Sequence, residues 1–202
     1  MQQLEKVEFE IVGEIMTKQR PRATVIGGHA RVYTPATTTN YENYIKTIFQ
    51  NKYPNASFGG KPLRVEIRCH FKASAELEKV AGYDVHRIPC KKHKDLDNVA
   101  KIVLDSLNGI AFNDDKQIIG LTCSKIYTDE QESIYVSISV DTYLYKSLQQ
   151  YKDIKKKNEL WHKIMELKSH EKLNKAETER LDRMIRQHTE LNQKLAHFNY
   201  ED

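Results

Sequence analysis

The sequence predicts an α/β (α+β) protein, in which helices pack on a mixed β-sheet and a helical hairpin follows at the C-terminus. Three observations lead to this prediction. Several stretches alternate strictly between apolar and polar residues, which is typical of strands that bury one face. Other stretches repeat apolar residues every three or four positions, which is typical of amphipathic helices. After about Tyr143 glycine and proline are absent and charged residues dominate, so we divide the chain into a core, residues 1–143, and an extension, residues 144–202.

Alternation predicts four strands and one hairpin in the core. Residues 63–71 give the cleanest pattern, with apolar and polar side chains alternating at every position. Further strands are predicted over residues 7–15, 117–127 and 133–140. The glycine pair Gly27–Gly28 indicates the turn of a hairpin after the first strand.

Two helices are predicted in the core. Apolar residues at helical spacing from Tyr41 to Ile48 indicate the first helix, just after the hairpin. The second is predicted from about residue 95 to residue 108, where an apolar stripe ends at an Asn-Gly pair. Residues 74–92 show no period and are predicted to form a surface loop.

The extension is predicted to be a helical hairpin that breaks at Asn174. Asn174 and Glu177 have the spacing of a capping box, in which each side chain accepts from the other residue's backbone N–H. From Lys146 onward there are 13 Lys and Arg against 10 Asp and Glu, which accounts for three of the chain's net +4. Because these charges are interspersed, we favour a hairpin packed on the core or on a partner protein over a basic arm that holds DNA.

Composition excludes several classes of protein. No apolar run reaches the roughly 20 residues that span a bilayer, and the N-terminus lacks the apolar core of a signal peptide. The three cysteines are widely spaced and form no Cys-x-x-Cys pair, so neither a disulfide framework nor a zinc site is indicated. We therefore expect a cytoplasmic protein with no membrane partner.

Acidic residues gather at the predicted start of the second core helix. Asp95 and Asp97 lie where free N–H groups and the helix dipole favour carboxylates, which is also where ordinary capping residues occur. Lys101 follows Asp97 by four residues, so its ammonium can reach the same space. An acid from the pair Asp114–Asp115, in the loop after the helix, can close an oxygen-rich pocket, although an Asp-Asp pair is also ordinary turn chemistry.

The donors of this pocket favour a hard divalent cation. Carboxylate oxygens without cysteine or paired histidines suit Mg²⁺, with Mn²⁺ as a substitute, better than zinc. Such an ion polarises a phosphoryl oxygen and generates hydroxide from bound water. We therefore predict that Asp95, Asp97, an acid from the pair Asp114–Asp115 and Lys101 form a metal site that cleaves the phosphate backbone of nucleic acid.

Two basic clusters are candidates for contact with that backbone. Lys18, Arg20 and Arg22 precede the hairpin, where a solvated turn is an equal alternative. Lys92 and Lys94 directly precede the acids, and although a run of charge is usually only solvated, this position favours backbone docking.

These motifs resemble the signature of the RusA family of Holliday-junction resolvases, which are crossover junction endodeoxyribonucleases. The residues that carry the resemblance are Asp95-Leu96-Asp97-Asn98, Lys101, Asp105, Leu107-Asn108-Gly109, Asp114-Asp115 and Gln117-Ile118. It extends more loosely over residues 5–141, including Arg20-Pro21-Arg22 and Tyr33-Thr34-Pro35. Residues 146–202 have no counterpart in the short members of the family.

The resemblance implies a RusA-like nuclease core and a Mg²⁺-dependent homodimer that resolves four-way DNA junctions by paired symmetrical nicks during recombination and repair. It places the protein in a bacterial or phage-infected cell, or in a prophage. By position it implies Asp95, Asp97 and Asp115 as metal ligands and Lys101 as the essential lysine. Asp114 becomes a neighbour of the site, and Asp105 matches the signature or anchors the helix.

Three alternatives stay open at this point. One is the same chemistry on other branched DNA or on RNA, because the junction preference rests on the resemblance alone. Another is a non-catalytic DNA-binding protein of the same fold, which the intact acidic set and Lys101 disfavour. The last is a structural protein whose C-terminal helices recruit a protein partner, a role that is compatible with catalysis.

Overall fold

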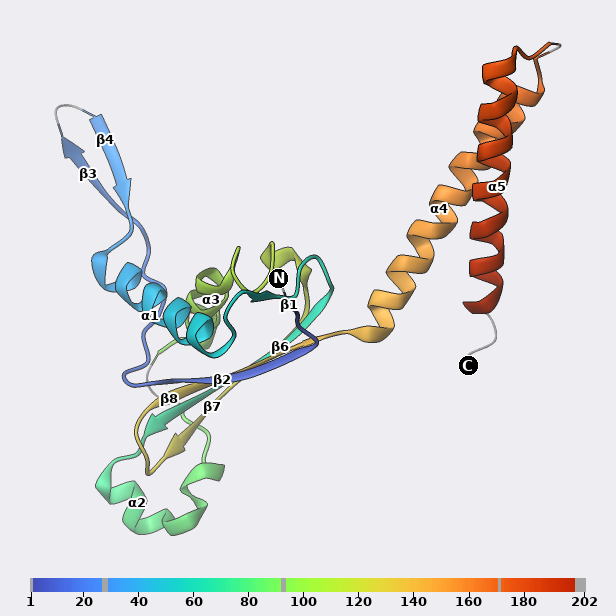
Figure 1. Cartoon of the computed structure of the whole chain (residues 1–202). Coiled ribbons are helices and arrows are strands. Elements are labelled where there is room, and N and C mark those ends of the chain that lie inside the picture. Colours follow the sequence, from blue (N-terminus) through green and yellow to red (C-terminus); the bar gives the residue numbers. More distant parts are fainter. Residues whose placement is uncertain (1, 27–28, 92–93, 171, 199–202) are drawn as a thin grey trace. The chain divides into compact units, whose positions relative to one another are not determined.

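The computed structural model describes the chain except for residues 1, 27–28, 92–93, 171 and 199–202 (Figure 1). It divides into two compact units, Met1–Asp141 and Thr142–Asp202, and each is described by itself. None of the helices in the described ranges is long and apolar enough to cross a membrane. Lys92, one of the predicted DNA contacts, lies outside the described residues.

The first unit is built on the mixed sheet that the sequence predicts. Across the sheet the strands follow the order β2 (Lys6–Val12), β8 (Ser133–Val140), β6 (Leu63–Lys72) and β7 (Ile118–Thr128). Strands β6 and β7 run parallel, and the other neighbours are antiparallel. A small separate pair joins β1 (Gln2–Gln3) to β5 (Ala56–Ser57). The predicted α+β class is therefore confirmed.

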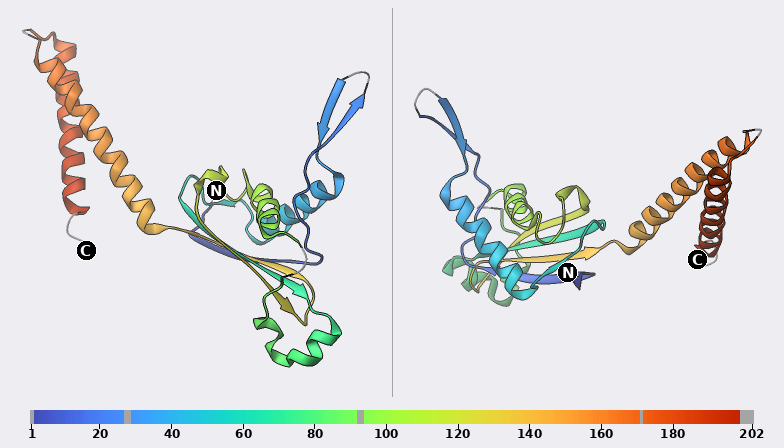
Figure 2. Two further views of the ribbon diagram at one scale, coloured as in Figure 1. Left: turned by 180° about the vertical axis from the view of Figure 1, so that it is seen from behind. Right: turned by 45° about the horizontal axis from the view of Figure 1, so that its top comes forward.

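Alternation along the strands decides which face of the sheet is buried. In β6 the side chains of Val65, Ile67 and Cys69 are buried, whereas the polar residues between them are more exposed. Helices α1 (Ala36–Lys52) and α3 (Leu96–Leu107) cover the buried face from the same side (Figure 2). Each large apolar side chain buried here contributes about 1.5–3 kcal/mol, so α3 rests on a well-packed support.

The prediction of a loop between β6 and the helix α3 is wrong. The loop expected over residues 74–92 contains α2 (Ala75–Ala81) and the 3₁₀ helix η1 (Gly82–Arg87). The Ser74 hydroxyl caps α2 by accepting from the N–H of Leu77 at 3.2 Å. Because α2 is only seven residues long and has no buried residue, no apolar period indicated it.

The predicted hairpin is present as a two-stranded ribbon. Strands β3 (Arg22–Ile26) and β4 (His29–Tyr33) pair antiparallel, and the ribbon stands away from the sheet in every view of Figures 1 and 2. The strand before it is shorter than predicted. It ends at Val12 because Gly13, with φ of 119°, adopts a backbone conformation that side chains disfavour.

The second unit is the predicted helical hairpin. It consists of α4 (Thr142–Lys168) and α5 (Lys175–Phe198). The break at Asn174 is a capping box, in which the N–H of Asn174 donates to Glu177 Oε2 at 2.9 Å and the N–H of Glu177 donates to Asn174 Oδ1 at 3.0 Å. A small cluster of buried residues joins the helices, namely Ile164, Leu181 and Met184.

Candidate metal and nucleic-acid site

The first turn of α3 presents two carboxylates to solvent. Asp95 is the N-cap residue, but its side chain makes no capping hydrogen bond. Asp97 lies in the first turn, and both residues are exposed. The Asp95 carboxylate therefore does not cap the helix, so helix capping does not explain why an aspartate lies at this position.

Lys101 lies one turn beyond Asp97 on the same side of α3. It is exposed, whereas Val99, Ile102 and Val103 on the opposite side are fully buried. Burial of that side fixes the rotation of the helix, and residues four apart share a face. Asp97 and Lys101 are therefore held toward the same region of solvent, at the positive end of the helix dipole.

Asp115 lies at the other end of α3. It begins the 3₁₀ helix η2 (Asp115–Gln117), directly before β7. The start of α3 lies instead beside the later part of β7, because Lys125 Nζ donates to the carbonyl of Lys94 at 3.1 Å. Helix α3 has 12 residues and therefore rises about 18 Å. Because Asp95 and Asp115 lie at its opposite ends, they are separated by roughly this length.

The structure thus brings together three of the four predicted catalytic residues. Asp95, Asp97 and Lys101 share one end of α3, and Asp115 does not join them within one chain. In the described part of the molecule, no three His, Cys, Asp or Glu side chains lie close enough together to hold a metal ion. The two carboxylates at the start of α3 nevertheless suit Mg²⁺ chemically, since that ion is commonly held by one or two carboxylates together with water and phosphate oxygens.

The turn that carries Asp115 is held by Gln117. The side-chain amide of Gln117 donates to the carbonyls of Gly59 and Lys61, at 2.7 and 2.8 Å. Its oxygen accepts from the backbone N–H groups of Asn113 and Asp114, at 2.8 and 3.0 Å. Four hydrogen bonds from one side chain fix this turn against the loop before β6.

Asp114 and Asp115 have different surroundings in that turn. The Asp114 carboxylate accepts from the N–H of Lys116 at 2.9 Å, and this hydrogen bond is the main reason that the pKa of Asp114 lies below its usual value. Asp115 is exposed. Because Asp114 already caps η2, Asp115 is the better candidate for a ligand.

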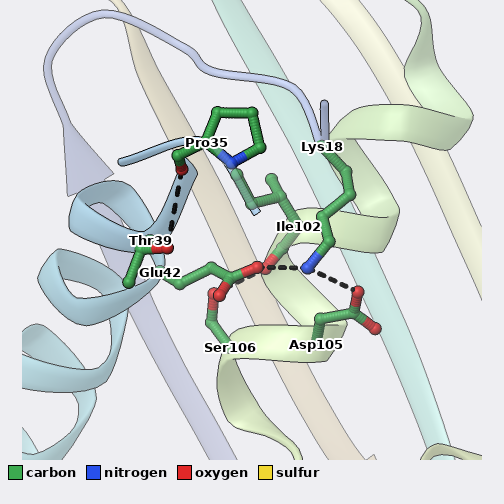
Figure 3. A network of polar contacts seen from close by, with 7 residues as sticks. All are labelled: Lys18, Pro35, Thr39, Glu42, Ile102, Asp105 and Ser106. Atoms are coloured by element: carbon green, nitrogen blue, oxygen red, sulfur yellow. Dashed lines mark hydrogen bonds and ion pairs between the residues drawn. The ribbon is translucent and has the colours of Figure 1, made fainter. Parts of the chain in front are cut away.

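Lys18 is held inside the first unit by two carboxylates. Figure 3 shows its ammonium between Glu42 of α1 and Asp105 of α3, with a distance of 3.0 Å to Asp105 Oδ2. The side chains of Lys18, Glu42 and Asp105 are only 21%, 15% and 29% exposed. Desolvation, the largest influence, lowers the pKa of Lys18, but hydrogen bonds to Glu42 and Asp105 and their charges together raise it above its ordinary value.

This three-residue clamp changes the interpretation of two predicted residues. Lys18, a predicted DNA contact, already neutralises carboxylates of the protein. Asp105 anchors its helix, which is one of the two roles expected for it. Its carboxylate holds α3 to Lys18 and, through Lys18, to α1. Glu42 was not predicted at all, because it lies 24 residues from Lys18 in the chain and no local pattern links them.

The other predicted DNA contacts are mostly at the surface. Arg20 and Arg22 are exposed at the base of the ribbon. Lys94 is half-buried, and its ammonium lies 3.4 Å from Glu14 Oε1. Arg20 and Arg22 are therefore better placed than Lys18 or Lys94 to meet a phosphate.

Two comparisons with known proteins cover the part of the chain that carries this site. The model of a family described as Endodeoxyribonuclease RusA matches residues 13–139, more than half of the 202 residues. The chain is also 25% identical over 130 residues to Uncharacterized protein YqaN of Bacillus subtilis (strain 168), a match that covers 61% of this chain and 89% of that protein. The family match includes the ribbon, α3 and η2, and it ends before α4.

Proposed function

Because the chain belongs to the RusA family of endodeoxyribonucleases, we propose that it is a metal-dependent nuclease that resolves Holliday junctions by paired symmetrical nicks. Members of this family act on branched DNA. The observation that carries the proposal for this chain is the exposed group of Asp95, Asp97 and Lys101 on a helix whose other side is buried. In this proposal Met1–Asp141 is the nuclease core and Thr142–Asp202 is an extension that offers a surface for a protein partner.

The residues at the start of α3 divide the chemistry between them. Asp95 and Asp97 are the ligands that would hold Mg²⁺, or Mn²⁺ in its place. When bound, such an ion polarises a phosphoryl oxygen, lowers the pKa of attacking water and neutralises the leaving alkoxide. Lys101 lies one turn from Asp97 on the same exposed face, where its ammonium would stabilise negative charge that develops on the phosphate. The N-terminal dipole of α3 favours a phosphate at this end of the helix.

A second copy of the chain can supply the missing carboxylate. In one chain Asp115 lies about the length of α3 away from Asp95, roughly 18 Å. When two copies pack around a two-fold axis with their α3 helices antiparallel, the Asp115 end of one helix lies beside the Asp95 end of the other. Each of the two sites then contains Asp95 and Asp97 from one chain and Asp115 from its partner. The symmetry also suits a substrate that needs two matching cuts.

The edge of the sheet beside α3 offers a surface for this pairing. β7 is an edge strand, and within the described residues only loop residues 88–90 pair with its outer edge, near Lys125 and Tyr127. Ile119 and Leu121 lie on the uncovered part and are 45% and 47% exposed. Apolar side chains on an open strand edge favour association with another chain. A homodimer through this edge would cover them.

The basic residues at the base of the ribbon supply the DNA contacts in this proposal. Arg20 and Arg22 are exposed and can pair with backbone phosphates, which position a duplex without reading its sequence. Lys94 directly precedes the acids, although it must first leave Glu14, and Lys92 stays a DNA contact predicted from the sequence alone. The substrate is therefore recognised by its branched shape and its charge.

The proposal is tested by incubating the purified full-length protein with a four-way junction, a replication fork and a linear duplex, each with Mg²⁺ and with EDTA. Paired nicks in the junction that need Mg²⁺ are expected. Equal nicking of the fork would widen the substrate to branched DNA in general. Cleavage that persists in EDTA, or in Asp97→Asn, would contradict the assigned site.

A further inference from the structure

The β3–β4 ribbon has two chemically different faces. Residues that lie opposite each other in an antiparallel pair share a face, and the pairs Arg22–Tyr33 and Thr24–Arg31 lie two positions apart. These four side chains therefore share one face, which carries two arginines, a hydroxyl and an aromatic ring, and the exposed His29 lies two positions further along the same face. All four are exposed.

This face has the composition of a surface that binds a DNA backbone. The guanidinium groups of Arg22 and Arg31 can each pair with a phosphate through two parallel hydrogen bonds. Five residues of a strand extend about 17 Å, and a two-stranded ribbon of this kind fits a major groove about 12 Å wide. The described side chains of the opposite face, those of Ala23, Ala30 and Val32, are small or β-branched.

An exposed ribbon can hold DNA in place only if its base is fixed to the catalytic part of the protein. Lys18 lies four residues before Arg22 and makes three contacts with the helices beneath. Its ammonium bridges Glu42 of α1 and Asp105 of α3 (Figure 3). Its backbone N–H donates to the carbonyl of Asn98 at 3.0 Å, next to Asp97. Lys18 therefore ties the start of the ribbon to the helix that carries the acids.

We propose that Lys18 is a positioning residue, whose clamp with Glu42 and Asp105 holds the arginine face of the ribbon against the DNA arm beside the nicking site. Lys18 itself does not touch the substrate, because its charge is already neutralised within the protein. The proposal rests on the assignment of the chain as a nuclease for branched DNA, and it adds Arg31 to the predicted DNA contacts.

The proposal is tested by a double-mutant cycle on binding of a four-way junction in EDTA, which keeps the DNA intact. Arg22→Gln removes one phosphate contact and is expected to weaken binding about tenfold. Lys18→Met frees the base of the ribbon that carries both Arg22 and Arg31, and it is expected to weaken binding by about tenfold or more. If Lys18 acts through the ribbon, the double variant binds no more weakly than Lys18→Met alone, because Lys18→Met has already removed the contribution of Arg22.

Two further variants separate positioning from loss of stability. Lys18→Arg keeps both ion pairs and is expected to restore binding. Lys61→Met removes another well-buried lysine, whose ammonium pairs with Glu5 Oε1 at 2.6 Å far from the ribbon in the chain. That control is expected to lower the melting temperature without weakening binding of DNA. Glu42→Gln, which leaves Lys18 in place, provides a milder break of the clamp if Lys18→Met does not fold.

The possible results are distinguishable. Normal junction affinity in both Lys18→Met and Glu42→Gln, or additive losses in the double variant, would overturn the role of Lys18 while leaving the proposed function intact. Weaker junction binding by Lys18→Met, together with an unchanged nicking rate at saturating DNA, would support the positioning role. The change would then affect how the junction binds and not the cleavage step. A wild-type protein that neither binds nor nicks the junction would overturn both proposals.

Discussion

The two ends of α3 carry different parts of the same predicted site and are supported in different ways. At the N-terminal end Asp95, Asp97 and Lys101 project from a regular helix that the Lys18 clamp ties to α1. At the C-terminal end Asp115 projects from a short turn that depends on the Gln117 side chain. The proposed ligands at the two ends of α3 are therefore held by independent sets of ion pairs and hydrogen bonds. Each end can therefore be broken without disturbing the other.

The largest effect is expected at the N-terminal end. Asp97→Asn removes a proposed metal ligand and retains the size of the side chain, so the nicking rate of the junction should fall by roughly 10²–10³-fold or more. Thermal unfolding should stay almost unchanged, because Asp97 is exposed. Nicking is measured with labelled junctions under single-turnover conditions.

A matched control is available on the same unit. Asp84 is an exposed aspartate in η1, where it pairs with Arg87 at 3.3 Å. Asp84→Asn should nick junctions at the wild-type rate. An equal loss in both variants would show that the effect of Asp97 is not specific to the site.

A smaller effect is expected at the C-terminal end from Gln117→Ala. This change removes four hydrogen bonds and leaves the carbonyls of Gly59 and Lys61 without this donor. Unfolding by denaturant should show a loss of about 2–4 kcal/mol. The nicking rate should fall because Asp115 is no longer held, whereas binding of the junction in EDTA should persist. A variant with normal nicking would show that the turn does not position Asp115.

The clamp predicts a modest dependence of stability on alkaline pH. The pKa of Lys18 is raised above its ordinary value of 10.5 in the folded protein. The stabilisation that the charged Lys18 ammonium gives the folded protein is therefore complete below pH 10.5. It is lost as the pH rises through the pKa of Lys18 in the folded protein. Lys18→Met should lower the free energy of unfolding by about 1–3 kcal/mol at neutral pH. The difference between wild type and variant should shrink above pH 10.5, and a constant difference would contradict the clamp.

The smallest effect on nicking is expected from truncation after Asp141, which removes no residue of α3, η2 or the ribbon. The removed helices form a separate compact unit with its own buried cluster. Junction nicking by the shortened protein should stay within about twofold of the full-length rate. Loss of the dimer on truncation, measured by sedimentation, would show that α4 and α5 contribute to the interface.

Local patterns were predicted well from the sequence. The capping box of Asn174 and Glu177 involves residues only three apart, so spacing alone indicated it. The strand over residues 63–71 was predicted from alternation because one face of the sheet is buried and the other is not. Both features depend on neighbours in the chain.

Features that depend on distant residues were predicted less well. The pair of Lys18 and Glu42 joins separate elements, and nothing in either segment indicates the other. The distance between Asp95 and Asp115 could have been anticipated, since a 12-residue helix rises about 18 Å. Because Asp95, Asp97 and Asp115 lie close together in the sequence, they were predicted to form one pocket within one chain. Helix α3 lies between them and holds Asp115 away from the other two.

Mixing two inactive variants tests the shared site most directly. Equal amounts of Asp97→Asn and Asp115→Asn protein are unfolded, refolded together and assayed on a junction that reports single nicks. In a mixed dimer with shared sites, one site contains both altered residues and the other contains none, so single nicks should return. Sites built within one chain would leave every site with one altered ligand, and the mixture would stay as inactive as either variant alone.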